Sequence, residues 1–243
     1  MRLLIFTLLF SSAILSATTP DSLKTKKWAV GLSYSPDFCF RMRYAKASEK
    51  GSSNMTENGK MGFTTGINLR YQLLDKIGIE FGALYSTKGQ KAETSSTNWV
   101  TPDNHTYDPS IPNYNSLGNL HIARKITFTY KYLEIPLKVN VYLINKRLKV
   151  FPSIGCSANI FMGKKTVSVY DGGKETSNSY DKKNIPAAEF AVLGGVGLSY
   201  DLTKNLFVKV EPSFRSFIRP LVDYPVSGTF YSLGANTGIY LKF

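Results

Sequence analysis

The chain has 243 residues, of which 13% are aromatic and 19% charged, and a formal net charge of +13 at pH 7. Its length fits one domain, and its many Gly, Tyr and Phe residues favour an all-β protein over a helical one. The positive charge alone would favour a nucleic-acid-binding protein, but the export signal at the amino terminus makes nucleic acid an unexpected partner.

Residues 1–17 have the pattern of a secretory signal peptide. Met1-Arg2 is positive, an apolar core runs from Leu3 to Leu15, and Ser16-Ala17 offers small residues for cleavage. The apolar core is too short for a good membrane-spanning helix, and no cysteine follows it that would carry a lipid anchor. We therefore expect an exported protein whose mature chain begins near Thr18.

Eight segments then alternate lipophilic residues with small or polar ones, which is the period of a β-strand. In the clearest of them, Ile67 and Leu69 alternate with Gly66, Asn68 and Arg70. The predicted strands cover residues 28–41, 61–72, 77–87, 126–143, 148–162, 189–202, 206–219 and 231–243.

The fourth of these segments changes phase. Its apolar residues are even-numbered from Ile126 to Tyr132 and odd-numbered from Leu133 to Leu143. One extra residue in a strand has this effect, so the sequence predicts a β-bulge near Tyr132-Leu133. Pro136 lacks a backbone donor and fits an irregular position in the same segment.

Short and long connections alternate along the chain. Three are tight, around residues 74–76, 145–147 and 203–205, and four are long, around residues 44–60, 88–125, 164–185 and 221–228. With an even number of strands, both termini and all short turns then lie at one end, as in single-chain outer-membrane barrels. Basic residues in the long connections are expected to meet lipopolysaccharide phosphates or to stay solvated: Arg43, Lys46, Lys50, Lys60, Lys88, Lys91, Arg124, Lys125, Lys164, Lys165, Lys174, Lys182 and Lys183.

The second face of the strands separates a membrane barrel from a soluble sheet. A soluble sheet would carry Lys, Glu and Thr on this face, whereas here Gly, Ser, Asn and Thr predominate, as in a narrow barrel filled by its own side chains. A nearly balanced set of charges shares the face. We expect hydrogen-bonded ion pairs in the lumen among Arg70, Glu80, Glu134, Lys138, Lys209, Glu211 and Arg215.

Aromatic residues on the lipophilic face gather at both strand ends. One predicted girdle contains Trp28, Tyr71, Tyr200 and Phe243, and the other Phe63, Tyr85, Phe190, Phe214 and Tyr231. The predicted fold is therefore an all-β, eight-stranded antiparallel up-and-down transmembrane β-barrel with short periplasmic turns and long extracellular loops. Residues 18–26 would be a short periplasmic segment, and residues 27–243 the barrel in the outer membrane of a Gram-negative bacterium.

Three runs of sequence carry a family resemblance. They are Tyr132-Leu133-Glu134-Ile135-Pro136-Leu137-Lys138-Val139, then Ile154-Gly155-Cys156-Ser157-Ala158, and the Gly-rich run from Leu193 to Leu198. The chain resembles the PorT-like outer-membrane β-barrel family over essentially its whole mature length, and the Tyr-Leu-Glu-Ile-Pro stretch is the specific part. The resemblance implies an integral outer-membrane barrel without a known activity, although one member is an accessory of a protein-secretion system.

Candidate catalytic and redox residues are few. His105 and His121 lie in the long connection 88–125, and neither has the local spacing of a metal site, so no cofactor or metal is expected. Cys39 belongs to the lumen-facing series of its strand and Cys156 to the lipid-facing series, across the barrel. Such positions are incompatible with the short Cβ separation of a disulfide, so two free thiols are expected.

Three functions are consistent with these residues. The first is a non-enzymatic barrel that anchors extracellular loops or supports an envelope assembly, with outer-membrane lipid, lipopolysaccharide and an envelope protein as candidate partners. The second is a narrow pore or transporter for small solutes, and the third is an outer-membrane hydrolase that uses His105 or His121. The expected ion pairs would block a pore, so the first function leads.

The last predicted strand alternates up to Phe243. In the barrels that the chain resembles, a terminal aromatic strand is read by the barrel-insertion machinery, which makes that machinery a further expected partner. Deletion of Phe243 should therefore lower the folded, membrane-inserted fraction more than it lowers any function of the loops. Heat-modifiable migration in gel electrophoresis measures that fraction, and unchanged insertion would contradict the assignment.

Overall fold

The computed structural model describes residues 26–43, 55–94, 125–170, 173–179, 187–219 and 228–243. The predicted signal peptide and both histidines lie outside these residues. The described chain forms ten strands: β1 (Trp28–Arg43), β2 (Met55–Leu74), β3 (Ile77–Thr94), β4 (Lys125–Val141), β5 (Ile144–Asn145), β6 (Leu148–Tyr170), β7 (Gly173–Ser179), β8 (Ala188–Asp201), β9 (Leu206–Phe217) and β10 (Gly228–Lys242). No helix in the described part of the chain is long and apolar enough to cross a membrane.

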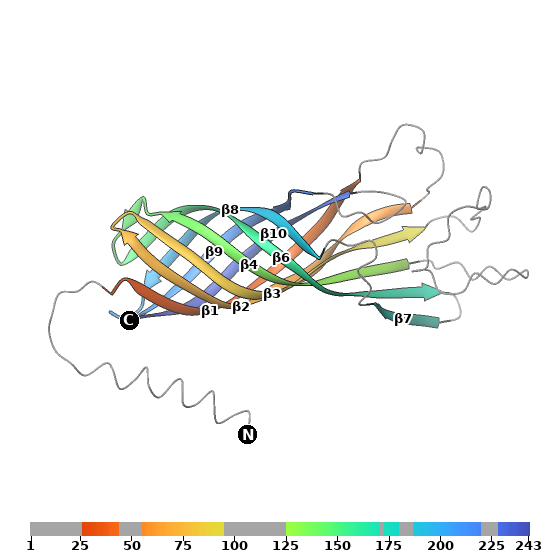
Figure 1. Ribbon diagram of the computed structural model, residues 1–243, viewed down its shortest axis with the longest axis horizontal. Coiled ribbons are helices and arrows are strands. Elements are labelled where there is room, and N and C mark those ends of the chain that lie inside the picture. Colours follow the sequence, from red (N-terminus) through yellow and green to blue (C-terminus); the bar gives the residue numbers. More distant parts are fainter. Residues whose placement is uncertain (1–25, 44–54, 95–124, 171–172, 180–186, 220–227) are drawn as a thin grey trace, which may run out of the picture.

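The strands close into a ring. Antiparallel neighbours follow the order β4-β3-β2-β1-β10-β9-β8-β6, and pairing between β4 and β6 joins the two ends. The short strands β5 and β7 add to β6 outside this ring. The predicted up-and-down barrel of eight strands is therefore confirmed (Figure 1).

The short turns gather at one end of the barrel together with the last residue, at the left of Figure 1. There the Phe243 N–H donates to the Trp28 carbonyl at 2.9 Å, and the Lys242 N–H donates to the Asn205 carbonyl at 2.7 Å. These bonds tie the final strand to both neighbours. We call this the short-turn end and the opposite one the long-loop end.

Outward side chains between the two ends are apolar. Leu32, Ile154 and Ile239, for example, are 57%, 67% and 59% exposed. Aromatic residues border this band: Trp28 lies 4.6 Å from Tyr71 between ring centroids at the short-turn end, and Phe63 lies 5.9 Å from Tyr85 at the long-loop end. A continuous exposed apolar band with aromatic borders is the surface that a lipid bilayer requires.

Several strands extend past the long-loop border farther than the alternation predicted. The structure adds residues 55–60 to β2, 88–94 to β3 and 163–170 to β6, and these pair with the start of β4 and with β7. We call this continuation the wall extension; it projects to the right in Figure 1. The prediction that basic residues lie in loops is therefore wrong for eight of them, all of which are in strands: Arg43, Lys60, Lys88, Lys91, Lys125, Lys164, Lys165 and Lys174.

The predicted bulge in the fourth strand is also misplaced. Even-numbered residues of β4 are the more buried ones along nearly its whole length, so Tyr130 and Tyr132 point into the barrel together with Glu134. The irregularity lies in the partner strand instead. Lys131 of β4 pairs with Gly163, but Tyr132 pairs with Phe161, so Met162 is the extra residue of β6. The apparent phase change arose because lumen-facing rings resemble lipid-facing ones in sequence.

Aromatic rings fill the barrel at two levels. The alternation in the sequence predicted mainly small residues on the lumen face and did not predict these rings. The long-loop ring layer consists of Tyr130, Tyr132, Phe161, Phe217 and Phe230, and the short-turn ring layer of Tyr142, Phe151, Phe207 and Tyr240. Glycine makes room beside these rings. A Cβ on Gly31 would overlap the ring of Tyr240, and one on Gly197 would overlap Phe151.

Gly31→Ala should destabilise the barrel by about 1–3 kcal/mol, because overpacking forces neighbours to move. The Tyr240 ring has little freedom, since it stacks on Phe207 with centroids 4.9 Å apart and its hydroxyl lies 3.4 Å from Glu80 Oε1. Urea unfolding of the folded protein measures the loss. Gly194→Ala is the control, because nothing lies within 4 Å of its added Cβ; equal losses in both variants would refute the packing argument.

Candidate functional site: the charged interior of the barrel

Ten charged side chains are buried among the described residues. Five are acidic and five basic: Asp37, Glu80, Glu134, Glu189 and Glu211 against Arg70, Lys88, Lys138, Lys209 and Arg215. The structure thus places all seven predicted lumen charges inside the barrel and adds Asp37, Lys88 and Glu189. Buried charges are costly unless they are paired, so the geometry of the ion pairs shows whether the side chains close the lumen.

The lower cluster contains Glu80, Lys138, Lys209 and Glu211. Lys209 Nζ lies 2.7 Å from Glu80 Oε1 and 3.0 Å from Glu211 Oε2. Lys138 Nζ lies 3.3 Å from Glu80 Oε1 and 2.9 Å from Glu211 Oε2. Each cation therefore contacts both carboxylates, and Ser153 Oγ donates a further 2.6 Å bond to Glu211.

These contacts join walls that are not neighbours. Glu80 is on β3 and Lys209 on β9, and the ring order places three strands between them in either direction. They are therefore opposite each other across the lumen. Because both carboxylates and both ammonium groups are nearly inaccessible, the lower cluster occupies the middle of the barrel as a cross-brace.

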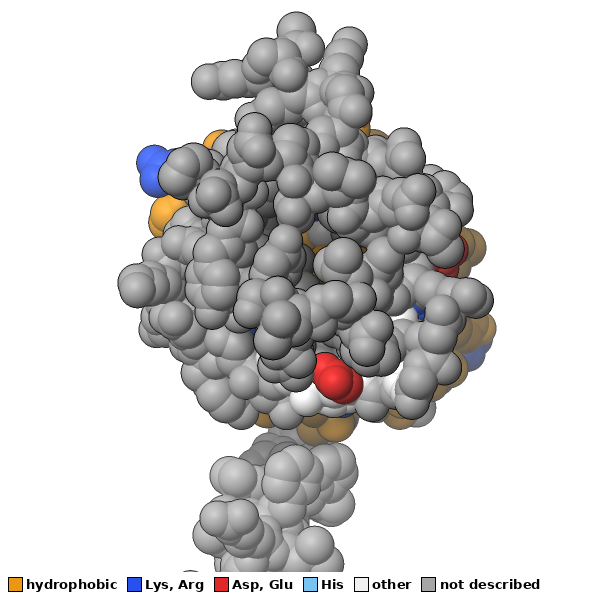
Figure 2. Space-filling view, turned by 90° about the vertical axis from the view of Figure 1, so that its right-hand side faces the viewer, with side chains coloured by type: hydrophobic (Ala, Val, Ile, Leu, Met, Phe, Trp, Pro, Cys, Tyr) orange, Lys and Arg blue, Asp and Glu red, His pale blue; other side chains and the backbone are white. Residues whose placement is uncertain are grey.

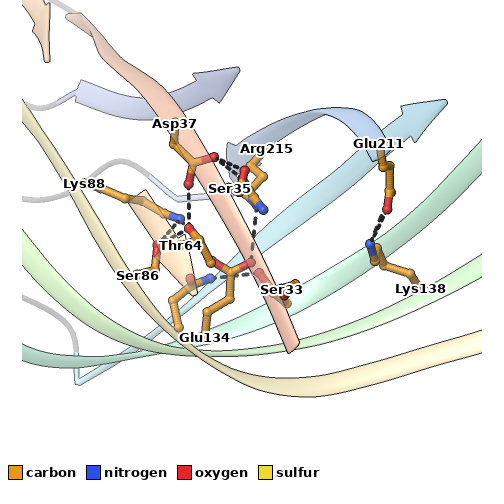
Figure 3. Close-up of polar contacts among 12 residues, drawn as sticks. Ser33, Ser35, Asp37, Thr64, Ser86, Lys88, Glu134, Lys138, Glu211 and Arg215 are labelled. Carbon is orange, nitrogen blue, oxygen red and sulfur yellow. Dashed lines mark hydrogen bonds and ion pairs between the residues drawn. The ribbon is translucent and has the colours of Figure 1, made fainter. Parts of the chain in front are cut away.

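The upper cluster contains Asp37, Lys88, Glu134 and Arg215, nearer the long-loop end. Arg215 Nη1 lies 2.7 Å from Asp37 Oδ1, and its Nε lies 3.5 Å from Glu134 Oε1. Lys88 Nζ lies 3.1 Å from Glu134 Oε2. Figure 3 shows how Ser35 and Thr64 turn their hydroxyls toward Asp37, at 2.7 Å and 2.5 Å.

Arg70 does not join either cluster, contrary to the expected ion pairing. Its guanidinium carbon lies 4.8 Å from the ring centroid of Tyr142, 5.1 Å from Phe207 and 5.7 Å from Phe151. The short-turn ring layer therefore holds Arg70 through cation–π contacts. Although Arg70 and Glu80 are register partners on β2 and β3, no ion pair joins them in the described chain.

Little space remains between the clusters. A cavity of about 10 Å³ is lined by residues that include Asn68, Glu134, Lys138 and Arg215. Such a volume accommodates about one water molecule. At this level the described part of the interior is filled by side chains.

The alternation of inward and outward residues could have identified two of the buried charges that the predicted set of lumen charges did not include. Lys88 continues the even-numbered inward series of Glu80, Leu84 and Ser86, but the predicted strand ended at residue 87. Asp37 was already on the predicted inward face of its strand, without being counted among the paired charges. A longer third strand would therefore have predicted the position of Lys88.

The cysteines lie as parity predicted. Cys39 is buried, Cys156 is exposed, and both are free thiols in the structure. His105 and His121 fall outside the described residues. Among those that are described, no group of three or more His, Cys, Asp or Glu could hold a metal ion.

Lys209→Met should cost roughly 3–5 kcal/mol, because it leaves the carboxylates of Glu80 and Glu211 buried with Lys138 as the one remaining cation. Lys125→Met is the matched control. It removes an exposed pair with Glu93 at 2.6 Å and should cost less than about 1 kcal/mol. Urea unfolding of both variants tests the difference, and similar losses would contradict a bracing role for the lower cluster.

Several solved membrane proteins have a similar arrangement of strands. The outer membrane protein OprG from Pseudomonas aeruginosa has 12% identity and a TM-score of 0.45, and covers 90% of this chain and 97% of its own. AlkL in DMPC bilayers has 13% identity and a TM-score of 0.44, with 93% and 95% covered. The outer membrane protease OmpT from Escherichia coli has 12% identity and a TM-score of 0.40, with 93% and 100% covered.

No curated protein sequence matches the chain. A family model does, but it does not identify the PorT-like group that the sequence resembles, so that membership stays a prediction. Residues 25–219 match the outer membrane protein beta-barrel domain, and the chain therefore belongs to this family, as a ring of eight antiparallel strands in the outer membrane of a Gram-negative bacterium.

Proposed function

We propose that the protein is a non-enzymatic outer-membrane anchor with a closed lumen, which holds a basic extracellular surface against lipopolysaccharide. The observation that carries this proposal is the filled interior. The lower cluster joins opposite walls, the upper cluster lies beside it, and a ring layer lies at each end. A lumen with this content supports attachment and display rather than passage of solutes.

Directly above the apolar band, the outward residues of the wall extension change from lipophilic to basic and polar. Leu133 and Tyr85 are the last lipophilic register partners of β4 and β3, and the next pair outward is Lys131 and Thr87, two residues farther along each strand. Beyond them Lys165, Lys91 and Lys125 share the outward side. Figure 2, which looks onto the long-loop end, shows basic side chains beside hydrophobic ones at the circumference.

This arrangement suits phosphate groups at the membrane surface. Lys131 and Lys125 are six residues apart on β4, which is about 20 Å along an extended strand. An ammonium group binds phosphate as a point charge, and lipopolysaccharide presents phosphates just outside the hydrocarbon region. The four outward lysines would therefore contact the lipid that surrounds the barrel, with Glu93 offsetting Lys125.

The other functions stay open to test. A pore predicts ohmic single-channel currents from the purified protein in planar bilayers, and such currents would overturn the closed anchor. A hydrolase predicts a lipase or protease activity that disappears when His105 and His121 are replaced by alanine. An accessory role in an envelope or secretion assembly predicts a reproducible partner after crosslinking of intact membranes.

The triple variant Lys91→Gln, Lys131→Gln, Lys165→Gln should bind lipopolysaccharide on the order of 100-fold more weakly, at about 1 kcal/mol per lysine. Titration of purified barrel with lipopolysaccharide measures the change. Dephosphorylated lipopolysaccharide should bind the unmodified protein as weakly as the intact lipid binds the variant.

The triple variant Lys76→Gln, Lys146→Gln, Lys204→Gln is the matched control. It removes the same charge from exposed residues in the turns at the short-turn end. Unchanged affinity in this control supports the outward lysines as the contact. An equal loss in both variants would reduce the effect to net charge and contradict the proposed surface.

A further inference from the structure

One rung of the barrel interior collects acceptor oxygens without donors. Glu134 of β4, Asn159 of β6 and Glu189 of β8 are successive register partners on three adjacent strands. Their side chains face inward and are 1%, 0% and 4% exposed. Side chains directly opposite on neighbouring strands have Cβ atoms about 4.5–5.5 Å apart, so the three termini share one region of the lumen.

Four oxygen atoms of this row accept no hydrogen bond: Glu134 Oε1, Asn159 Oδ1, and both Glu189 Oε1 and Oε2. Glu134 Oε1 still lies 3.5 Å from Arg215 Nε in an ion pair, so the three oxygens of Asn159 and Glu189 are the ones without a partner in the described chain. The nearby donors are committed elsewhere. Lys88 bonds Ser86 and the other Glu134 oxygen, and the Asn159 amide donates to Ser157 Oγ at 3.0 Å and to the Glu189 backbone carbonyl at 3.4 Å. The row therefore offers acceptors alone.

The charge of the row is also uncompensated. In the upper cluster Lys88 and Arg215 balance Glu134 and Asp37. Glu189 forms no ion pair with any described residue, and the other unpaired charge of the interior, Arg70, lies in the short-turn ring layer near the opposite end. An ionised Glu189 therefore carries one uncompensated negative charge next to the free oxygen of Asn159, in a place where an isolated charge is costly.

We propose that the Glu134–Asn159–Glu189 row binds one dehydrated alkali-metal cation. Carboxylate and amide oxygens are hard ligands, which suit s-block cations rather than soft transition metals. A single positive charge balances Glu189. A divalent ion would leave an excess positive charge next to Lys88 and Arg215.

The surroundings favour retention of such an ion. On the long-loop side the row is covered by Tyr132 and Phe161, whose ring centroids are 5.9 Å apart in an edge-on contact. Pro136, Ser157 and Ala191 follow on the short-turn side, each the next inward residue of its strand. The polar groups of these flanking residues are the hydroxyls of Tyr132 and Ser157, and the Ser157 hydroxyl already accepts from the Asn159 amide, so binding would rest chiefly on the row itself.

Rubidium locates the site directly. Crystals of the full barrel grown in rubidium chloride should show an anomalous peak within bonding distance of Glu189 and Asn159. Crystals of Glu189→Gln should lack that peak, because the amide supplies donors to the same oxygens and removes the charge. Absence of the peak from the unmodified protein would overturn the proposal.

Stability supplies the second test. At constant ionic strength, the melting temperature should rise by roughly 5–10 °C when sodium replaces choline and reaches about one hundred times its Kd. Glu189→Gln should lose this shift, while Glu175→Gln, an exposed carboxylate on β7, should keep it. Three outcomes would each refute a metal cation. They are equal melting temperatures in both salts, a shift that persists in Glu189→Gln, and the same rise in melting temperature when mild acid is used instead of sodium.

Discussion

The charge balance of a lumen with almost no free volume constrains every wall of this barrel. Glu80 on β3 and Lys209 on β9 are 129 residues apart, and their side chains meet at 2.7 Å. Neither would be tolerated alone in that environment, so the strands must hold their registers for the pairs to form. The outward face sets the protein in the bilayer, whereas the inward face fixes one arrangement of the strands relative to each other.

Alternation in the sequence was sufficient for the architecture, because a period of two assigns each residue of a strand to one face. It placed Glu80, Lys138 and Glu211 inside. It could not distinguish a ring that packs in the lumen from a ring that contacts lipid, and therefore misread Tyr130 and Tyr132. Alternation also could not predict the contacts across the ring. Strand order shows which walls are opposite, but it does not show how far each side chain reaches.

The ends of the strands were the hardest part to predict. Above the bilayer the outward face of β4 becomes polar while Ile126 and Tyr130 stay buried on its inward face, and both faces of β3 become largely polar. The pattern that marks a membrane strand is therefore lost although hydrogen bonding continues to Glu93 and Lys125. Lys88 shows the consequence, because it lies where the pattern weakens yet its ammonium group is buried in an ion pair. The candidate cation row could not be predicted for another reason: its members come from three strands, and their shared property is an inward oxygen atom that accepts no hydrogen bond.

The extra residue of β6 separates two registers. Met162 and Gly163 together oppose Lys131, and Gly163 has a φ of 155°, which glycine adopts readily. Below this point odd-numbered residues of β6 face the lumen, and above it even-numbered ones do. A strand without the bulge would turn Lys165 inward and Lys164 away from the rings of Phe128 and Tyr130. The bulge therefore lets the wall extension carry Lys165 on its outer surface and Lys164 on its inner one, independently of the pattern of the membrane portion.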